Sequence, residues 1–211
     1  MTKVLFNLKN RVADTIMLTL YARALESQQA HPILYDEFAL KLVAQIDYDF
    51  SIFDNISTTA VGVAIRSKHF DTISHEFIES HAQPIVVIIG CGLDTRKQRL
   101  GPIADKAVFI QLDLPEVIDF RRQLLPPGPN EQLIRASLLE TAWMDELLAH
   151  YPQGDFLFIV EGVLMYLSQE ENQQFFYALA ERFIGAQLHF DIFNQWMSQH
   201  TAWHQGVNRT Q

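Results

Sequence analysis

The stretch PIVVIIGCG, residues 84–92, decides the fold. Its first six residues are apolar and mostly β-branched, which is typical of a central parallel strand covered on both faces. The run ends in Gly90-Cys91-Gly92, and glycines at that point allow a tight turn and a close approach of the backbone to a ligand. The stretch therefore predicts a buried strand that ends in a ligand-binding turn.

Further apolar runs follow this strand at a regular spacing. Counted from Gly90, the next three runs end 23, 24 and 24 residues apart, at Asp113, Ser137 and Glu161. A fifth run covers residues 187–193. A repeat of this length fits a strand, a loop and a helix, so the pattern predicts a parallel sheet with right-handed crossovers.

The first 80 residues predict helices instead. Apolar residues recur at intervals of four over about residues 12–29, and Asp36 is placed to cap a second helix. Ser57 or Thr58 is placed to cap a third helix. We expect these helices to form a lid over the carboxyl edge of the sheet, where open α/β folds bind ligands.

Length and composition indicate one globular domain. The 211 residues are 48% apolar and carry a net charge of −9, which argues against a nucleic-acid binder. No apolar run approaches the roughly 20 residues that span a bilayer. A single cysteine, Cys91, excludes a disulfide framework and fits a cytoplasmic location. We expect residues 1–81 to form the helical lid and residues 82–211 the α/β core of the same domain.

Asp113 adds a second binding signal to the glycine turn. It lies 21 residues after Gly92, at the end of the next predicted strand. An acidic residue there is placed to bind ribose hydroxyls. The alternative is a structural glycine turn followed by an aspartate that caps the helix beginning at Pro115.

Two cofactor classes fit this arrangement. A dinucleotide-binding oxidoreductase needs a third glycine, where this chain has Thr95, and Asp94 beside a pyrophosphate costs roughly 1 kcal/mol. S-adenosylmethionine carries a sulfonium and no phosphate. The acidic loop therefore favours S-adenosylmethionine over NAD.

Several longer strings resemble one known family. They are VVIIGCGLDTRKQRLG at 86–101, FIQLDLPEVIDFRR at 109–122, FLFIVEGVLMYLSQEE at 156–171, YARALESQQAHPILYDEFALKL at 21–42 and GVAIRSKHFDTI at 62–73. Together they resemble the leucine carboxyl methyltransferase family, and within it the bacterial tetracenomycin-type polyketide O-methyltransferases. The resemblance implies a Rossmann-like class I methyltransferase sheet of order 3-2-1-4-5. It also implies transfer of a methyl group from S-adenosylmethionine to a hydroxyl or carboxyl group of a small molecule.

The resemblance also implies roles for particular residues. Arg66 matches the arginine that holds the cofactor carboxylate, and Glu161 the acid near the cofactor's amino group. Gly90 matches the glycine that lies against the methionine part, and Asp113 the acid that binds the ribose. Cys91, Gly92 and Leu114 are also expected to contact the cofactor. Tyr21 and Tyr166 are expected to line the acceptor pocket. Together with Tyr21, an apolar, aromatic site would contain Met17, Phe50, Phe53 and Phe70, although ordinary helix packing explains most of these side chains.

One position departs from the family. The family usually has an aspartate near the adenine, where this chain has Ser137, followed by Leu138. A serine hydroxyl still hydrogen-bonds an amino group but offers no charge-assisted bond, which is about twice as strong. The departure puts cofactor affinity in doubt and keeps open a non-catalytic, cofactor-binding relative as an alternative.

The other polar residues predict less. No residue is assigned as a catalytic base. Arg96 and Arg99 are expected to pair with Asp94 or with carbonyl groups. Glu116 and Glu131 are expected to be surface charges. His200 and His204 are four residues apart, but without an acidic or cysteine partner they predict no metal site.

The length is short for this fold. A class I methyltransferase sheet normally ends with a helix and an antiparallel hairpin, and only 18 residues follow Phe193. We expect that the hairpin is missing because the chain is truncated, which could leave it inactive. If the sheet instead stops at its fifth strand, a homo-oligomer is expected to cover the open edge.

Overall fold

The computed structural model describes residues 3–5, 11–53 and 56–192. The fifth predicted run extends to Phe193, and that residue lies outside the described part, as do His200 and His204. Within the described residues, no helix is both long and apolar enough to cross a membrane.

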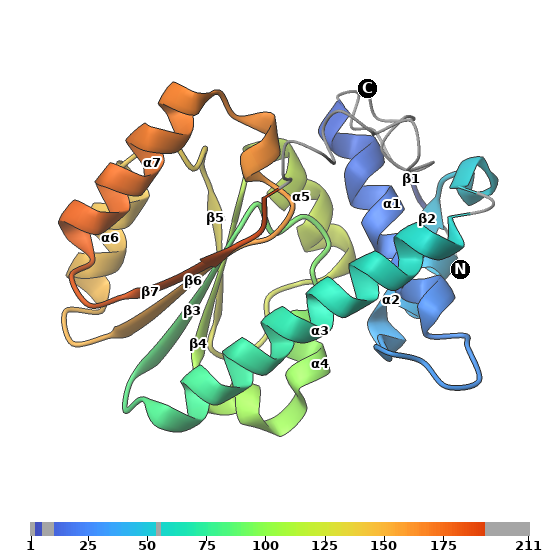
Figure 1. Ribbon diagram of the computed structural model, residues 1–211, viewed down its shortest axis with the longest axis horizontal. Helices are drawn as coiled ribbons and strands as arrows, with labels where there is room; N and C mark the ends of the chain where they lie inside the picture. Colours follow the sequence, from blue (N-terminus) through green and yellow to red (C-terminus); the bar gives the residue numbers. More distant parts are fainter. Residues whose placement is uncertain (1–2, 6–10, 54–55, 193–211) are drawn as a thin grey trace.

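A five-stranded parallel sheet forms the centre of the molecule (Figure 1). The strand order is β5-β4-β3-β6-β7, which is the predicted order 3-2-1-4-5 when strands are counted from residue 84. The prediction of sheet order and strand direction is thus confirmed. The strands are β3 (Pro84–Ile89), β4 (Val108–Asp113), β5 (Glu131–Arg135), β6 (Asp155–Val160) and β7 (Gln187–Phe190).

Helices cover both faces of this sheet. On one face α6 (Ala142–His150) and α7 (Gln169–Arg182) pack against alternate residues of β3, such as Val87. On the other face α3 (Ser57–Ser80) and α5 (Pro115–Leu124) pack against the intervening residues. All six residues of β3 are buried, as its unbroken apolar sequence predicted. The two layers of helices leave the carboxyl edge of the strands open to ligands.

The N-terminal region adds α1 (Arg11–Glu26), α2 (Glu37–Gln45), the 3₁₀ helix η1 (Phe50–Phe53) and a two-stranded sheet of β1 (Val4–Leu5) and β2 (Ile46–Asp47). Asp36 caps α2 as predicted, because its carboxylate accepts the Ala39 N–H at 2.8 Å. The predicted Ser57 or Thr58 cap is wrong, since Ile56 precedes α3 without a side-chain cap.

Helix α3 joins the N-terminal region to the core. Its side chains Phe70, Phe77 and Ile78 are buried in one cluster with Val86 and Ile88 of β3. The second half of α3 is therefore one of the layers that cover the sheet. Helices α1 and α2 pack in a separate cluster beside it, at the right of Figure 1.

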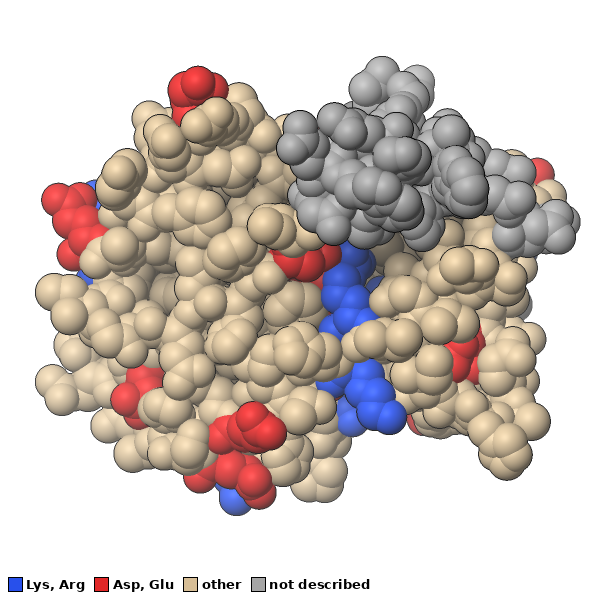
Figure 2. Space-filling model, in the orientation of Figure 1, with Lys and Arg blue, Asp and Glu red and all other residues tan. Residues whose placement is uncertain are grey.

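Short elements connect the strands to the helices. They are α4 (Arg96–Leu100), η2 (Gly101–Lys106) and η3 (Leu164–Tyr166). Pro115 opens α5 as expected, and α7 begins with the predicted capping box of Ser168 and Glu171. Charged side chains are spread over the surface seen in Figure 2, where most of the visible Lys and Arg atoms lie in one central band and Asp and Glu form several separate groups.

Candidate active site at the carboxyl edge of the sheet

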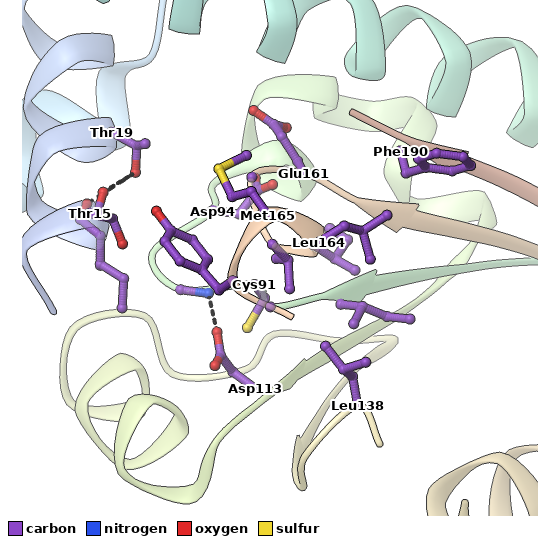
Figure 3. A pocket seen from close by; sticks show the side chains of 18 of the residues that line it. Thr15, Thr19, Cys91, Asp94, Asp113, Leu138, Glu161, Leu164, Met165 and Phe190 are labelled. Atoms are coloured by element: carbon purple, nitrogen blue, oxygen red, sulfur yellow. Dashed lines mark hydrogen bonds between the residues drawn. The ribbon is translucent and has the colours of Figure 1, made fainter. Parts of the chain in front are cut away.

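A cavity of about 1010 Å³ lies at the carboxyl ends of β3, β4 and β6 (Figure 3). Residues of α1 and α3, among them Thr19 and Arg66, form another part of its wall. A cavity for one drug-sized ligand measures about 300–1,000 Å³, so this one has room for a cofactor and a small acceptor.

The glycine turn after β3 forms part of the cavity floor. Gly90 and Gly92 have φ angles of +66° and +45°, which side chains rarely adopt. A Cβ atom at Gly90 would lie 2.3 Å from Cγ2 of Val163. Both glycines are therefore required by backbone conformation or by space, as the sequence suggested.

Asp113 is held at the end of β4 by the backbone of this turn. Its carboxylate accepts the Gly92 N–H at 2.7 Å and the Leu114 N–H at 2.8 Å. Burial raises the pKa of Asp113 to about 6, even though both hydrogen bonds and Arg121 lower it. Asp113 lines the cavity and offers a carboxylate to neutral hydroxyl groups.

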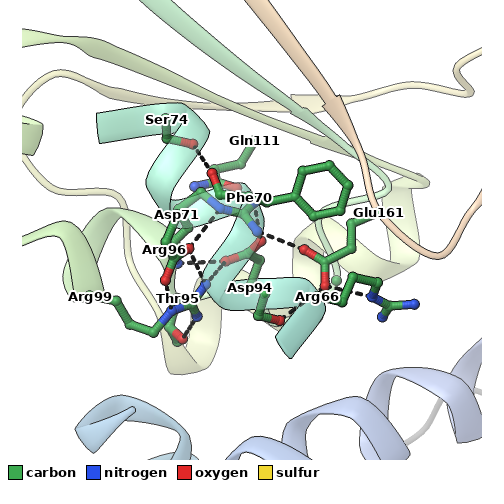
Figure 4. A network of polar contacts seen from close by, with 12 residues as sticks. Arg66, Phe70, Asp71, Ser74, Asp94, Thr95, Arg96, Arg99, Gln111 and Glu161 are labelled. Atoms are coloured by element: carbon green, nitrogen blue, oxygen red, sulfur yellow. Dashed lines mark hydrogen bonds and ion pairs between the residues drawn. The ribbon is translucent and has the colours of Figure 1, made fainter. Parts of the chain in front are cut away.

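Glu161, directly after β6, lies in the opposite electrostatic setting (Figure 4). Its carboxylate pairs with Arg66 at 2.9 Å and Arg96 at 2.6 Å, and it accepts the Ser67 hydroxyl at 3.0 Å. Burial would raise the pKa of Glu161, but the two guanidinium groups overcome that effect and lower it. Glu161 is thus a carboxylate that keeps its charge.

Arg96 and Arg99 form a buried network behind the glycine turn. Arg96 pairs with Asp94 at 2.7 Å, and both arginines contact Asp71 of α3. The predicted pairing with Asp94 is confirmed. Burial would raise the pKa of Asp94, but Arg96 and Arg99 hold it well below its usual range.

This network also reaches the N-terminal region. Asp36 pairs with Arg23 of α1 at 2.9 Å and with Arg99 at 3.1 Å. Arg23 in turn donates to the Leu93 carbonyl at 2.8 Å. Helices α1 and α2 are thereby attached to the loop that follows the glycine turn.

Every residue that the resemblance assigned to the cofactor lines this one cavity: Arg66, Gly90, Cys91, Gly92, Asp113, Leu114, Ser137, Leu138 and Glu161. Tyr166 also lines it, and burial raises the pKa of its phenol. At the position that the resemblance places near the adenine, the Ser137 hydroxyl accepts the Leu139 N–H at 3.3 Å.

Two expectations fail in the structure. Tyr21 does not line the cavity, and its ring stacks on Phe50 at 5.2 Å between centroids. Met17, Phe53 and Phe70 are likewise buried packing residues. Glu131 is not a surface charge, because its side chain is 3% exposed and its carboxylate accepts a hydrogen bond from the Gln111 amide at 3.1 Å. Glu116 is exposed as expected.

The sequence did not indicate several residues of the site. The most informative is Asp191, which pairs with Arg66 at 2.9 Å directly after β7. An acid immediately after a strand was the signal that identified Asp113 and Glu161, and the same rule would have found Asp191. Thr15, Thr19, Met165 and Phe190 also line the cavity. Among the described residues, no cluster of His, Cys, Asp or Glu could hold a metal ion.

Known proteins resemble this chain in sequence. The family model for leucine carboxyl methyltransferase matches residues 16–180. The tetracenomycin polyketide synthesis O-methyltransferase TcmP of Streptomyces glaucescens is 29% identical over 94% of this chain and 72% of its own length. The S-adenosyl-L-methionine-dependent methyltransferase dpfgK of Gibberella zeae is 28% identical over 75% of this chain and 57% of its own length.

A solved structure resembles the fold. A presumed methyltransferase from Thermobifida fusca superposes with a TM-score of 0.51 over 90% of this chain and 70% of its own, at 18% identity. That likeness supports the class I methyltransferase fold alone. With the family match over most of the chain, the protein belongs to the leucine carboxyl methyltransferase family of S-adenosyl-L-methionine-dependent enzymes.

Proposed function

We propose that this chain binds S-adenosylmethionine in the carboxyl-edge cavity and transfers its methyl group to an oxygen atom of a small molecule. The observation that carries the proposal is the distribution of charge in the cavity. The described lining residues include three carboxylates, Asp94, Asp113 and Glu161, and two guanidinium groups, Arg23 and Arg66. Arg96, behind the lining, pairs with both Asp94 and Glu161, so in the described part of the chain Asp113 is the lining carboxylate without an ion-pair partner. The cavity thus has one end with an unpaired acid and one end with charges of both signs.

The residues present fit the two ends of such a cofactor. Asp113 would accept hydrogen bonds from the ribose hydroxyls, with Ser137 and Leu138 beside the adenine. At the other end, Glu161 and Arg66 offer charges of both signs to an amino acid group. Bound S-adenosylmethionine supplies a methyl group already activated by its sulfonium, so the chain itself needs no nucleophile.

The chain's own task is to position the reacting groups and to exclude water. Apolar side chains of the cavity, including Val163, Leu164 and Phe176, provide a wall that suits a hydrophobic acceptor. A carboxylate acceptor is already ionised at neutral pH, whereas a phenol with a pKa near 10 benefits from a base. TcmP is named for polyketide synthesis, and we extend an aromatic, polyketide-like acceptor to this chain as part of the proposal.

The NAD alternative is disfavoured by the loop after the glycine turn. The Asp94 carboxylate accepts the Arg96 N–H at 2.5 Å, at the start of α4. Dinucleotide-binding folds place a pyrophosphate at the corresponding helix N-terminus. In this chain the negatively charged Asp94 carboxylate lies at that helix N-terminus.

Calorimetric titration of the purified chain tests the proposal. We expect S-adenosylhomocysteine to bind in the micromolar range and NADH to give no heat of binding. Tighter binding of NADH would overturn the assignment. Mass spectrometry should then detect conversion of S-adenosylmethionine to S-adenosylhomocysteine when naphthols and naphthoic acids are offered as acceptors. Binding without turnover across such a panel would favour the non-catalytic relative.

Several broader expectations stay predictions. These are the cytoplasmic location, the division of labour between a lid at residues 1–81 and a core at 82–211, and a homo-oligomer covering the open sheet edge. Size-exclusion chromatography with light scattering measures the oligomeric state directly.

A further inference from the structure

Asp191 lies at a junction of three elements. It follows β7, its Oδ1 accepts the Gly162 N–H at 2.6 Å, and its Oδ2 accepts from Nη1 of Arg66 at 2.9 Å. One carboxylate therefore connects the turn after β6 with the arginine of α3. Nothing in the sequence or in the resemblance to relatives assigned a role to this residue.

The Arg66 guanidinium is fixed from two further sides. Its Nε donates to Glu161 at 2.9 Å. A Cβ atom at Gly162, where φ is +72°, would lie 3.4 Å from Nη2 of Arg66, so the guanidinium lies close over this glycine. Glu161, Gly162 and Asp191 together form a cradle that sets the plane of the guanidinium.

The cradle leaves part of the guanidinium available to a ligand. An arginine carries five N–H donors in a fixed planar arrangement. Arg66 uses one at Nε and one at Nη1, so within the described residues three donors, at Nη1 and Nη2, have no protein partner. The side chain lines the cavity and is 24% exposed. Its remaining donors suit a bidentate contact with a carboxylate.

We propose that Asp191 is a positioning residue that holds Arg66 in the orientation needed to bind the carboxylate of the cofactor's amino acid end. This inference rests on the proposed function, because it assigns the cofactor carboxylate to Arg66. Asp191 acts through Arg66 and has no direct contact with the ligand in this role. Its loss frees the guanidinium to rotate, so only ligands with a carboxylate lose affinity.

Two probes that differ by one group test this role. S-adenosylhomocysteine carries the carboxylate, and S-adenosyl-3-thiopropylamine is the same molecule without it. In Asp191→Ala, the Kd of S-adenosylhomocysteine is expected to rise about tenfold or more, as for loss of a charged hydrogen bond, and the Kd of the decarboxylated probe to change less than twofold. Asp191→Asn keeps an oxygen for the Gly162 N–H but loses the charge, and an intermediate effect is expected.

Two further variants separate positioning from a structural role. Arg66→Ala should show the same selectivity between the probes, and adding Asp191→Ala to it should change neither Kd further. The matched control is Asp155→Ala, since Asp155 also accepts a backbone N–H, that of Gln83 at 3.0 Å, but at the other end of the sheet. This control should leave both Kd values unchanged.

The outcomes are distinguishable. Equal weakening of both probes in Asp191→Ala would show a structural role and overturn the proposal, as would unchanged binding of S-adenosylhomocysteine. If the unmodified chain binds neither probe, the proposed function itself fails.

Discussion

Asp113 and Glu161 are buried carboxylates at the same edge of the sheet, and their environments differ sharply. Asp113 ends β4, Glu161 follows β6, and both strands pair with β3. Asp113 accepts backbone N–H groups, and among the described residues no cation forms an ion pair with it. Glu161 pairs with Arg66 and Arg96. The pKa of Asp113 consequently rises to about 6, and the pKa of Glu161 falls below its usual value.

The difference shows that partners, and not burial alone, set the charge of a buried acid. A carboxylate without a counter-ion suits neutral hydroxyl donors such as those of a ribose. A carboxylate inside a set of guanidinium groups keeps its charge and suits a zwitterionic amino acid group. One cavity thus offers two chemically distinct ends.

Removing one of the two counter-ions of Glu161 is expected to give the largest effect. Arg96→Met deletes a fully buried guanidinium that contacts Asp71, Asp94 and Glu161. Breaking a buried pair in this way costs about 3–5 kcal/mol, so urea unfolding at pH 7 should show a large loss of stability. Arg135→Met is the control, because its pair with Asp119 is half exposed and such pairs contribute about 0–1 kcal/mol. Equal losses of unfolding free energy in the two variants would contradict a stabilising role of the buried Arg96 network.

Replacing Asp113 tests the other end of the cavity. Asp113→Asn should weaken S-adenosylhomocysteine binding at least tenfold, because a hydrogen bond to a charged group contributes about 1.5–3 kcal/mol. Glu116→Gln, a change at an exposed acid on the following helix, should leave the affinity unaltered. If calorimetry finds wild-type affinity in Asp113→Asn, the ribose assignment is wrong.

The two pKa directions predict an asymmetric pH dependence. Asp113 gains a proton as the pH falls through about 6, and a protonated carboxyl accepts hydrogen bonds poorly. The affinity for S-adenosylhomocysteine should therefore fall below pH 6, by at most about tenfold per pH unit. Glu161 stays ionised over that range because its pKa is lowered. Titrations from pH 5 to 8 measure how the affinity for S-adenosylhomocysteine changes with pH. This dependence should be weaker in Asp113→Asn. If it is unchanged in that variant, another titrating group causes it.

The smallest expected effect concerns the adenine position. Ser137→Asp should tighten S-adenosylhomocysteine binding about fivefold, because a charge-assisted hydrogen bond is about twice as strong as a neutral one. Ser137→Ala, which removes the hydroxyl, is the matched comparison. Unchanged or weaker binding in Ser137→Asp would show that the adenine amino group does not lie at this residue.

Much of the fold follows from local sequence patterns. The unbroken β-branched run before Gly90 predicted a doubly covered strand, and the regular spacing of strand ends predicted a parallel sheet, whereas the order of its strands was implied by the family resemblance. Asp36 and Pro115 marked helix starts correctly. These signals succeed because strand burial, turn geometry and capping depend on residues close together in the chain. The Ser57 cap failed since no hydroxyl bond forms at the start of α3.

The electrostatics of the site could not be predicted in this way. The contacts of Arg66 span 95 residues to Glu161 and 125 to Asp191, and Tyr21 turned toward Phe50 because of helix packing that its sequence neighbours do not specify. The sequence by itself determined the sheet, the glycine turn and the acids at two strand ends. Only the tertiary structure decided which charges meet, because a pKa depends on partners brought together by packing across the whole chain.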